Sequence, residues 1–192
     1  FYAPNVSWIV MRSGMDKQHD LMASVNGSLG NHAHANGISL ELYGKGYVLG
    51  PDAGIGKFMY SGLDYTEYYS QMPAHNTVVV DGVSSYPVMM SQHAFKVIAS
   101  YPKVSKEQPA SKKLAEQKER MTYATVSFIE PETQALQQRT TAVVKTSDKG
   151  GYYVDVFRSK RQDGNDKTHD YFYHNLGQEM KVTDAATEQP LN

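Results

Sequence analysis

The stretch MTYATVSFIEPETQALQQRTTAVVKTSDKGGYYVDVFRSK, residues 121–160, decides the fold class. Three runs within it, 121–130, 137–146 and 152–160, alternate apolar with polar side chains and are rich in Val, Thr, Tyr and Phe, which is typical of β-strands that bury one face. The segment SDKGG, residues 147–151, has the composition of a hairpin loop. The stretch therefore predicts consecutive antiparallel strands.

The same alternation recurs along the rest of the chain. Further segments of this kind are SWIVMRS (7–13), ISLELYG (38–44), NTVVVDG (76–82), AFKVIASYP (94–102) and HDYFYHNL (169–176). Many strands with little helical patterning favour an antiparallel sandwich. We therefore expect an all-β chain that forms a single antiparallel β-sandwich domain over residues 1–192. Two segments break the pattern: SGLDYTEYYSQ (61–71), a helical turn or tyrosine-bearing loop, and the charged excursion 105–120.

Composition and charge narrow the function classes. Hydrophobic residues make up 40% and charged residues 20% of the chain, which argues against a disordered protein, and the formal net charge of −1 gives no field that would attract nucleic acid. No apolar run reaches the roughly 20 residues needed to cross a bilayer. Cysteine is absent, so a transition-metal site must use His, Asp or Glu. We expect a partner other than nucleic acid or a membrane.

Two histidines stand one residue apart in the segment GNHAHANG, residues 30–37. In a β-strand, successive side chains point to opposite faces, so His32 and His34 would project from the same face. Either they form a polar pair on a wet sheet face, or one is a neutral metal ligand and its neighbour is free to carry protons.

Two further residues are candidates for completing a metal site. Asp52 lies in the turn LGPDAGIG (49–56), and His75, in the segment PAHNTVVVDG (73–82), stands at the opening of a predicted strand. Two imidazoles and a carboxylate can supply three ligands to zinc. Their spacing fits ordinary polar residues at strand ends equally well, so both interpretations stay open on these grounds.

The order of these motifs resembles a known family. The run HAHANGISLELYGKGYVLGPDAGIG, a tyrosine-rich segment, AHNTVVVDG, and much later YYVDVFRSK and HDYFYHNLG are similar to the β-sandwich part of the heparinase II/III-like polysaccharide lyases, a group that includes related alginate lyases. The resemblance covers residues 8–177. It implies a supersandwich-like fold, normally preceded by an N-terminal (α/α) toroid, and a bacterial periplasmic or secreted location. We therefore expect a fragment of a longer two-domain lyase whose toroid lies elsewhere in the parent chain.

The resemblance also implies roles for individual residues. His32 becomes the catalytic histidine, and His34, Asp52 and His75 become the ligands of a structural Zn²⁺. Tyr60 is the first choice for a second catalytic residue, because it follows the glycine turn after Asp52. The other tyrosines in the same interval are Tyr65, Tyr68 and Tyr69. Asn36 stands where relatives commonly have Asp, which affects a hydrogen bond around the metal site.

The reaction that the resemblance implies is β-elimination of an anionic, uronate-containing polysaccharide such as heparan sulfate, heparin or alginate. A base removes the C5 proton, an acid protonates the departing O4, and a third group stabilises the charge that develops on the uronate carboxylate. His32 suits the base role, because an unperturbed histidine pKa of about 6.5 leaves a neutral fraction near pH 7. The alternative is a non-catalytic carbohydrate-binding or structural β-domain with a stabilising zinc.

Overall fold

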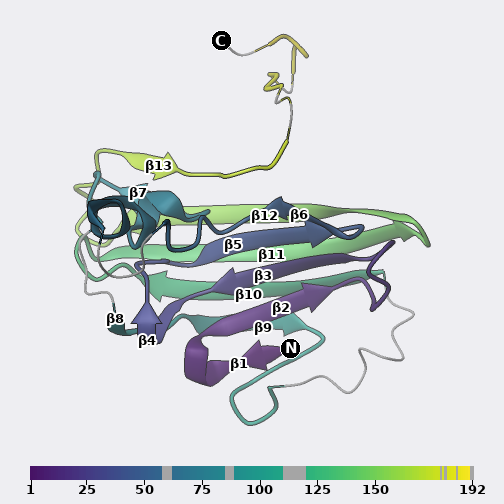
Figure 1. Cartoon of the computed structure of the whole chain (residues 1–192), viewed down its shortest axis with the longest axis horizontal. Helices are drawn as coiled ribbons and strands as arrows, with labels where there is room; N and C mark the ends of the chain where they lie inside the picture. Colours follow the sequence, from purple (N-terminus) through teal and green to yellow (C-terminus); the bar gives the residue numbers. More distant parts are fainter. Residues whose placement is uncertain are drawn as a thin grey trace.

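The chain folds into a β-sandwich (Figure 1). The computed structural model describes residues 1–57, 62–84, 89–109, 120–177, 179, 181–184 and 186–190. Within these residues every pairing between strands is antiparallel, as the sequence predicts.

Two large sheets form the layers of the sandwich. The five-stranded sheet has the order β1 (Tyr2–Ala3), β2 (Trp8–Arg12), β3 (Leu21–Asn26), β5 (Ser39–Gly44), β6 (Tyr47–Gly50). The four-stranded sheet has the order β12 (Gly150–Arg161), β11 (Ala135–Ser147), β10 (Met121–Ile129), β9 (Lys96–Tyr101). Two small sheets pair β13 (His169–Tyr171) with β7 (Val78–Val80) and β4 (Ser28–Ala33) with β8 (Met89–His93). Figure 1 shows both small sheets at the same end of the sandwich.

The apolar core lies between the two large sheets. Alternate side chains of each sheet point inward, which is the consequence of a strand period of two. The five-stranded sheet contributes Ile9, Met11, Leu21, Ala23, Val25, Leu40 and Leu42, and the four-stranded sheet contributes Ala124, Val126, Phe128 and Val143. This arrangement confirms the predicted antiparallel sandwich.

Several details differ from the sequence expectation. The strands β10, β11 and β12 form the predicted consecutive antiparallel pairs, but β3, β6 and β8 are strands that the alternation did not predict. The segment 169–176 is a strand only over its first three residues. Its backbone then runs beside the residues that precede β7 and beside β6, since the N–H of Phe172 donates to the Thr77 carbonyl and the N–H of Leu176 donates to the Leu49 carbonyl.

The two segments that break the pattern are only partly described. Tyr65–Tyr69 forms a short π-helix, η2, which confirms a helical turn within 61–71, and Pro4–Val6 and Met72–Ala74 form the 3₁₀ helices η1 and η3. Ser61 and residues 110–119 of the charged excursion lie outside the described residues. Where helices are described, none has the length and apolar character needed to cross a membrane.

Candidate functional site

The strand that carries His32, β4, is interrupted at that residue. The register between β4 and β8 shifts between Asn31 and Ala33, and His32 has a left-handed backbone with φ of 61°. This is a β-bulge, which adds one residue to a strand and breaks the alternation of its faces. The expectation that His32 and His34 share one strand face is therefore wrong, and β4 ends at Ala33, before His34.

Both histidines nevertheless line the same cavity, which has a volume of about 460 Å³. Asp52, Asn36 and Trp8 also line it. His32 is exposed, whereas His34 is half-buried. The bulge thus presents an accessible imidazole beside a more enclosed one.

The three residues expected to bind metal come together, with His34 and Asp52 lining the cavity and His75 buried behind them. The Nδ1 atom of His75 lies 2.6 Å from the Oδ2 atom of Asp52, and the ring centroids of His34 and His75 are 5.4 Å apart. His75 is fully buried at the end of η3, and Asp52 lies in the turn after β6. Segments far apart in the sequence therefore deliver two imidazoles and a carboxylate to one place.

Electrostatics favour the protonation states that a metal site needs. Burial, together with the nearby His75, lowers the pKa of His34, which favours the neutral imidazole. Burial alone would raise the pKa of Asp52, but the hydrogen bond and charge of His75 and the Gly54 N–H lower it below its usual value. Neutral imidazole and ionised carboxylate are the forms that coordinate metals.

The side chains of this cluster are of the types that bind zinc, but their present arrangement does not coordinate a metal ion. In the described part of the chain, no group of three or more His, Cys, Asp or Glu side chains is arranged so that it could hold a metal ion. His75 and Asp52 are hydrogen-bonded to each other, so shared coordination requires a rearrangement of these side chains. The donor types fit Zn²⁺, and the buried Nε2 atom of His75 has no hydrogen-bond partner among the described residues. Zinc binding by His34, Asp52 and His75 stays a prediction.

Asn76, in the His-Asn-Thr motif, fixes the segment that carries His75. Its side-chain amide donates to the carbonyls of Leu40 (2.8 Å) and Pro51 (3.1 Å), which joins that segment to β5 and to the turn that holds Asp52. Because these contacts connect three separate segments, they hold the site more firmly than any one loop could.

The fully buried Arg139 on β11 supports Asn76 from inside the sandwich. Its guanidinium donates to the carbonyls of Asn76 (2.6 Å) and Ile38 (2.7 Å), to both carboxylate oxygens of Asp155 (2.8 Å each), and to the Tyr171 hydroxyl (2.7 Å). Sequence patterning missed this residue, because a single charge in an alternating strand predicts an outward-facing side chain.

His174 was also missed as part of the site. Its ring lies 3.0 Å from the Asn76 side-chain oxygen and 3.2 Å from the Tyr68 hydroxyl, and burial followed by the nearby His75 lowers its pKa. His169, five residues earlier in the chain, contacts Asp166 and Ser159 and takes no part in this cluster.

The structure does not identify the tyrosine expected to act as a second catalytic residue with His32. Tyr60 lies outside the described residues. Among the other tyrosines of this interval, the buried Tyr65 packs edge-on against the His34 ring at 5.4 Å, and Tyr68 contacts His174. Asn36, at the position that departs from the family pattern, binds Ser28 through its backbone N–H, and its buried side-chain oxygen has no hydrogen-bond partner in the described structure.

Comparisons with known proteins agree on one family. The family described as Heparinase II/III-like, C-terminal, matches residues 1–147. An endo-acting ulvan lyase from Formosa agariphila is 34% identical over 169 residues, which cover 83% of this chain and 20% of that protein.

Solved structures show the same fold. Heparinase III matches with a TM-score of 0.54 and 15% identity, over 82% of this chain and 22% of that one. The heparan sulfate lyase HepC from Pedobacter heparinus matches with a TM-score of 0.56 and 19% identity, over 82% and 21%. The chain thus spans about a fifth of the length of these relatives.

Proposed function

Because this chain belongs to the heparinase II/III-like family of polysaccharide lyases, as the C-terminal β-sandwich domain, we propose that it supplies the catalytic histidine of a β-eliminating lyase. The observation that carries the proposal is the cavity in which the exposed His32 lies beside His34 and Asp52. An accessible imidazole in an open cavity can serve as the general base that β-elimination requires.

His32 acts as the base that takes the C5 proton of a uronate residue. Its place on the bulge directs it into the open cavity, whereas the buried His75 and the enclosed His34 are unsuited to contact a polymer. Elimination also requires an acid for the leaving O4 and a group that stabilises the uronate carboxylate. Tyr60 of this chain is the first candidate for the acid, and we assign the group that stabilises the carboxylate to the remainder of a longer parent chain.

His34, Asp52 and His75 hold a structural Zn²⁺ in this proposal. The metal would tie the end of β4, the turn after β6 and the segment after η3 together, and would thereby fix the position of His32 without contacting substrate. The gathered donor types and the unpartnered Nε2 atom of His75 support this assignment.

The substrate in this proposal is an anionic, uronate-containing polysaccharide. Ulvan is the first polymer to test, because the relative that is 34% identical is named as an ulvan lyase. Heparan sulfate follows from the structural neighbours, and alginate rests on the sequence resemblance alone.

The test uses the full-length parent protein and the ultraviolet absorbance of the unsaturated uronate product. His32→Asn keeps a residue type that tolerates a left-handed backbone, and it should lower kcat on ulvan at least about 100-fold with an unchanged melting temperature. His19→Asn is the matched control, because His19 contacts Asp16 in the loop beyond the far end of β2. Retained activity in His32→Asn would refute the role of His32. Binding of polymer without cleavage by the unmodified parent would favour a non-catalytic carbohydrate-binding domain instead.

A further inference from the structure

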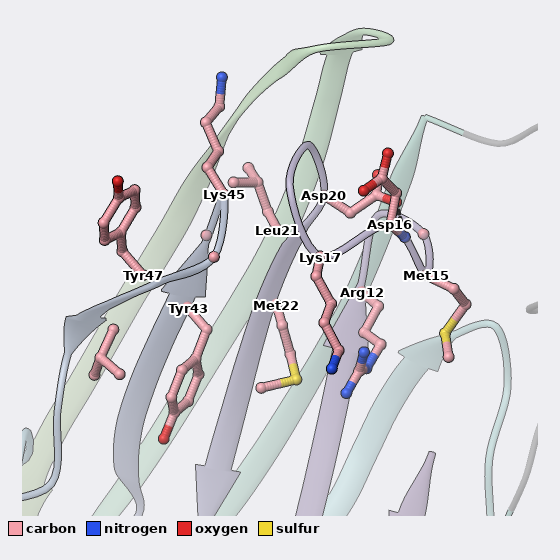
Figure 2. Close-up of a pocket in the computed structure, with 14 residues that line it drawn as sticks. Arg12, Met15, Asp16, Lys17, Asp20, Leu21, Met22, Tyr43, Lys45 and Tyr47 are labelled. Carbon is pink, nitrogen blue, oxygen red and sulfur yellow. Dashed lines mark hydrogen bonds between the residues drawn. The ribbon is translucent and has the colours of Figure 1, made fainter.

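A second cavity, of about 260 Å³, lies at the other end of the five-stranded sheet (Figure 2). The loop between β2 and β3 and the ends of β2, β3, β5 and β6 enclose it. Its size is just below the roughly 300 Å³ at which small-molecule sites begin, so it suits a single sugar residue better than a long segment of polymer.

A cross-strand row of side chains forms the floor of this cavity. Arg12 on β2 lies directly opposite Met22 on β3, and Met22 lies directly opposite Tyr43 on β5. These three residues face away from the core, whose residues alternate with them along each strand. Since neighbouring strands are about 4.8 Å apart, the row places a cation about 10 Å from an aromatic ring, with a thioether between them.

Two of the cations that line this cavity, Arg12 and Lys17, have no carboxylate partner in the described structure, whereas the third, Lys45, donates to the Lys149 carbonyl. Arg12 is half-buried and Lys17 is exposed, and neither side chain makes a hydrogen bond or an ion pair with any described residue. In Figure 2 both extend toward the side on which Met22 and Tyr43 lie. A half-buried guanidinium without a counter-charge favours the binding of an anion.

The carboxylates nearby have other partners. Asp20 lies 3.0 Å from the ammonium group of Lys145, and Asp16 lies 2.7 Å from the ring of His19. In Figure 2 both carboxylates are directed away from the ends of Arg12 and Lys17. The cavity therefore combines two available cations with a partly apolar floor.

The cavity also shares a sheet face with the candidate active site. Trp8 and Asn26 line the cavity of His32 and lie opposite each other at the other end of β2 and β3. Trp8 and Arg12 are both on β2, four residues apart, so they point to the same face at a separation of about 13 Å. A single extended polysaccharide can therefore contact both ends of this face.

We propose that this cavity is a second carbohydrate-binding site, which holds one anionic sugar residue of a polysaccharide remote from the bond that is cleaved. Arg12 and Lys17 pair with its carboxylate or sulfate group, and Met22 and Tyr43 pack against the sugar ring. The choice of a polysaccharide as ligand rests on the proposed function, whereas the location rests on the cavity and its unpaired cations.

Affinity electrophoresis of the full-length parent protein in gels that contain ulvan tests the site. Arg12→Gln/Lys17→Gln should bind about fivefold to tenfold more weakly, because each partly solvated charge pair contributes a few-fold to affinity. Lys96→Gln/Lys103→Gln removes two exposed charges elsewhere and is the matched control. Lys17→Glu, a single change in an exposed loop, should weaken binding as well. It provides an independent test if the double variant does not fold.

Kinetics separate this site from the candidate active site. On an oligosaccharide too short to reach both cavities, Arg12→Gln/Lys17→Gln should keep its kcat and KM, whereas on the polymer its KM should rise. Unchanged retardation in the gel, or an equal loss in Lys96→Gln/Lys103→Gln, would overturn the proposal. If the parent protein lacks lyase activity, the proposed function fails, but the gel result still decides whether this site binds ulvan. The charges of alginate are all carboxylates, whereas heparan sulfate also carries sulfate groups. A comparison of binding to these two polymers therefore tells which anion the site recognises.

Discussion

Replacement of Arg139 by Met is the sharpest test of how the fold supports the candidate site. The substitution keeps a long side chain but removes five donated hydrogen bonds, two of them to Asp155. Asp155 then still accepts hydrogen bonds from the hydroxyls of Tyr171 (2.9 Å) and Thr141 (3.2 Å). The loss of one partner of a buried ion pair costs about 3–5 kcal/mol, and the 19% exposure of the Asp155 side chain favours the lower end of that range.

A destabilisation of about 3 kcal/mol corresponds to a fall of about 6–12 °C in melting temperature for a protein of this size. Thermal and urea unfolding of the single variant measure the loss. The double variant Arg139→Met/Asp155→Leu should recover part of it, because no buried charge is then left unpaired. A single variant within about 1 kcal/mol of the unmodified protein would show that this pair does not support the segment around Asn76.

Three further predictions concern metal, pH and the extent of the chain. His34→Ala should lose about one bound zinc and melt at a lower temperature, whereas His32→Asn should keep both, and metal analysis beside calorimetry distinguishes them. Hydrogen bonds from the N–H groups of Thr168 and Lys167, with a contribution from Arg161, lower the pKa of Asp81 from 3.8 to about 2. Because the folded-state pKa is the lower one, this carboxylate stabilises the fold above about pH 4 and loses that effect as the pH falls toward 2, so Asp81→Asn should melt with a shallower pH dependence over that range. The 192-residue chain alone should release no unsaturated uronate from ulvan or heparan sulfate, and clear turnover would show that it holds the complete catalytic machinery.

The parts of the fold that the sequence predicts are those with strong alternation. Strands β10 to β12 carry long runs of Val, Thr, Tyr and Phe, and the structure places them as predicted. Strand β3, LMASVN, was not predicted because the apolar Met22 lies on its outer face and the small Ala23 on its inner face, which weakens the contrast between the two faces. Strand β13 is shorter than predicted, since the N–H of His174 donates to the Asn76 side chain rather than to a strand, and Asn76 lies almost a hundred residues away in the sequence.

The sequence predicts which residues come together in the candidate site, but not how they are arranged. The motifs around His34, Asp52 and His75 point to residues that do come together. The bulge at His32 has no local sequence signal, because a left-handed histidine is imposed by the pairing of β4 with β8. Arg139 was likewise out of reach, since its partners lie on four other segments of the chain.

The network that the buried Arg139 forms with Asp155 and Tyr171 also limits how this domain can be recombined with its relatives. The three residues lie on β11, β12 and β13, so a chimaera with a crossover between residues 139 and 155 takes the arginine from one parent and its carboxylate from the other. Where the second parent carries an uncharged side chain, the chimaera inherits an unpaired buried charge. Crossovers placed before β11 or after β13 keep the set intact, and libraries of exchanged lyase domains should be enriched in survivors with those boundaries.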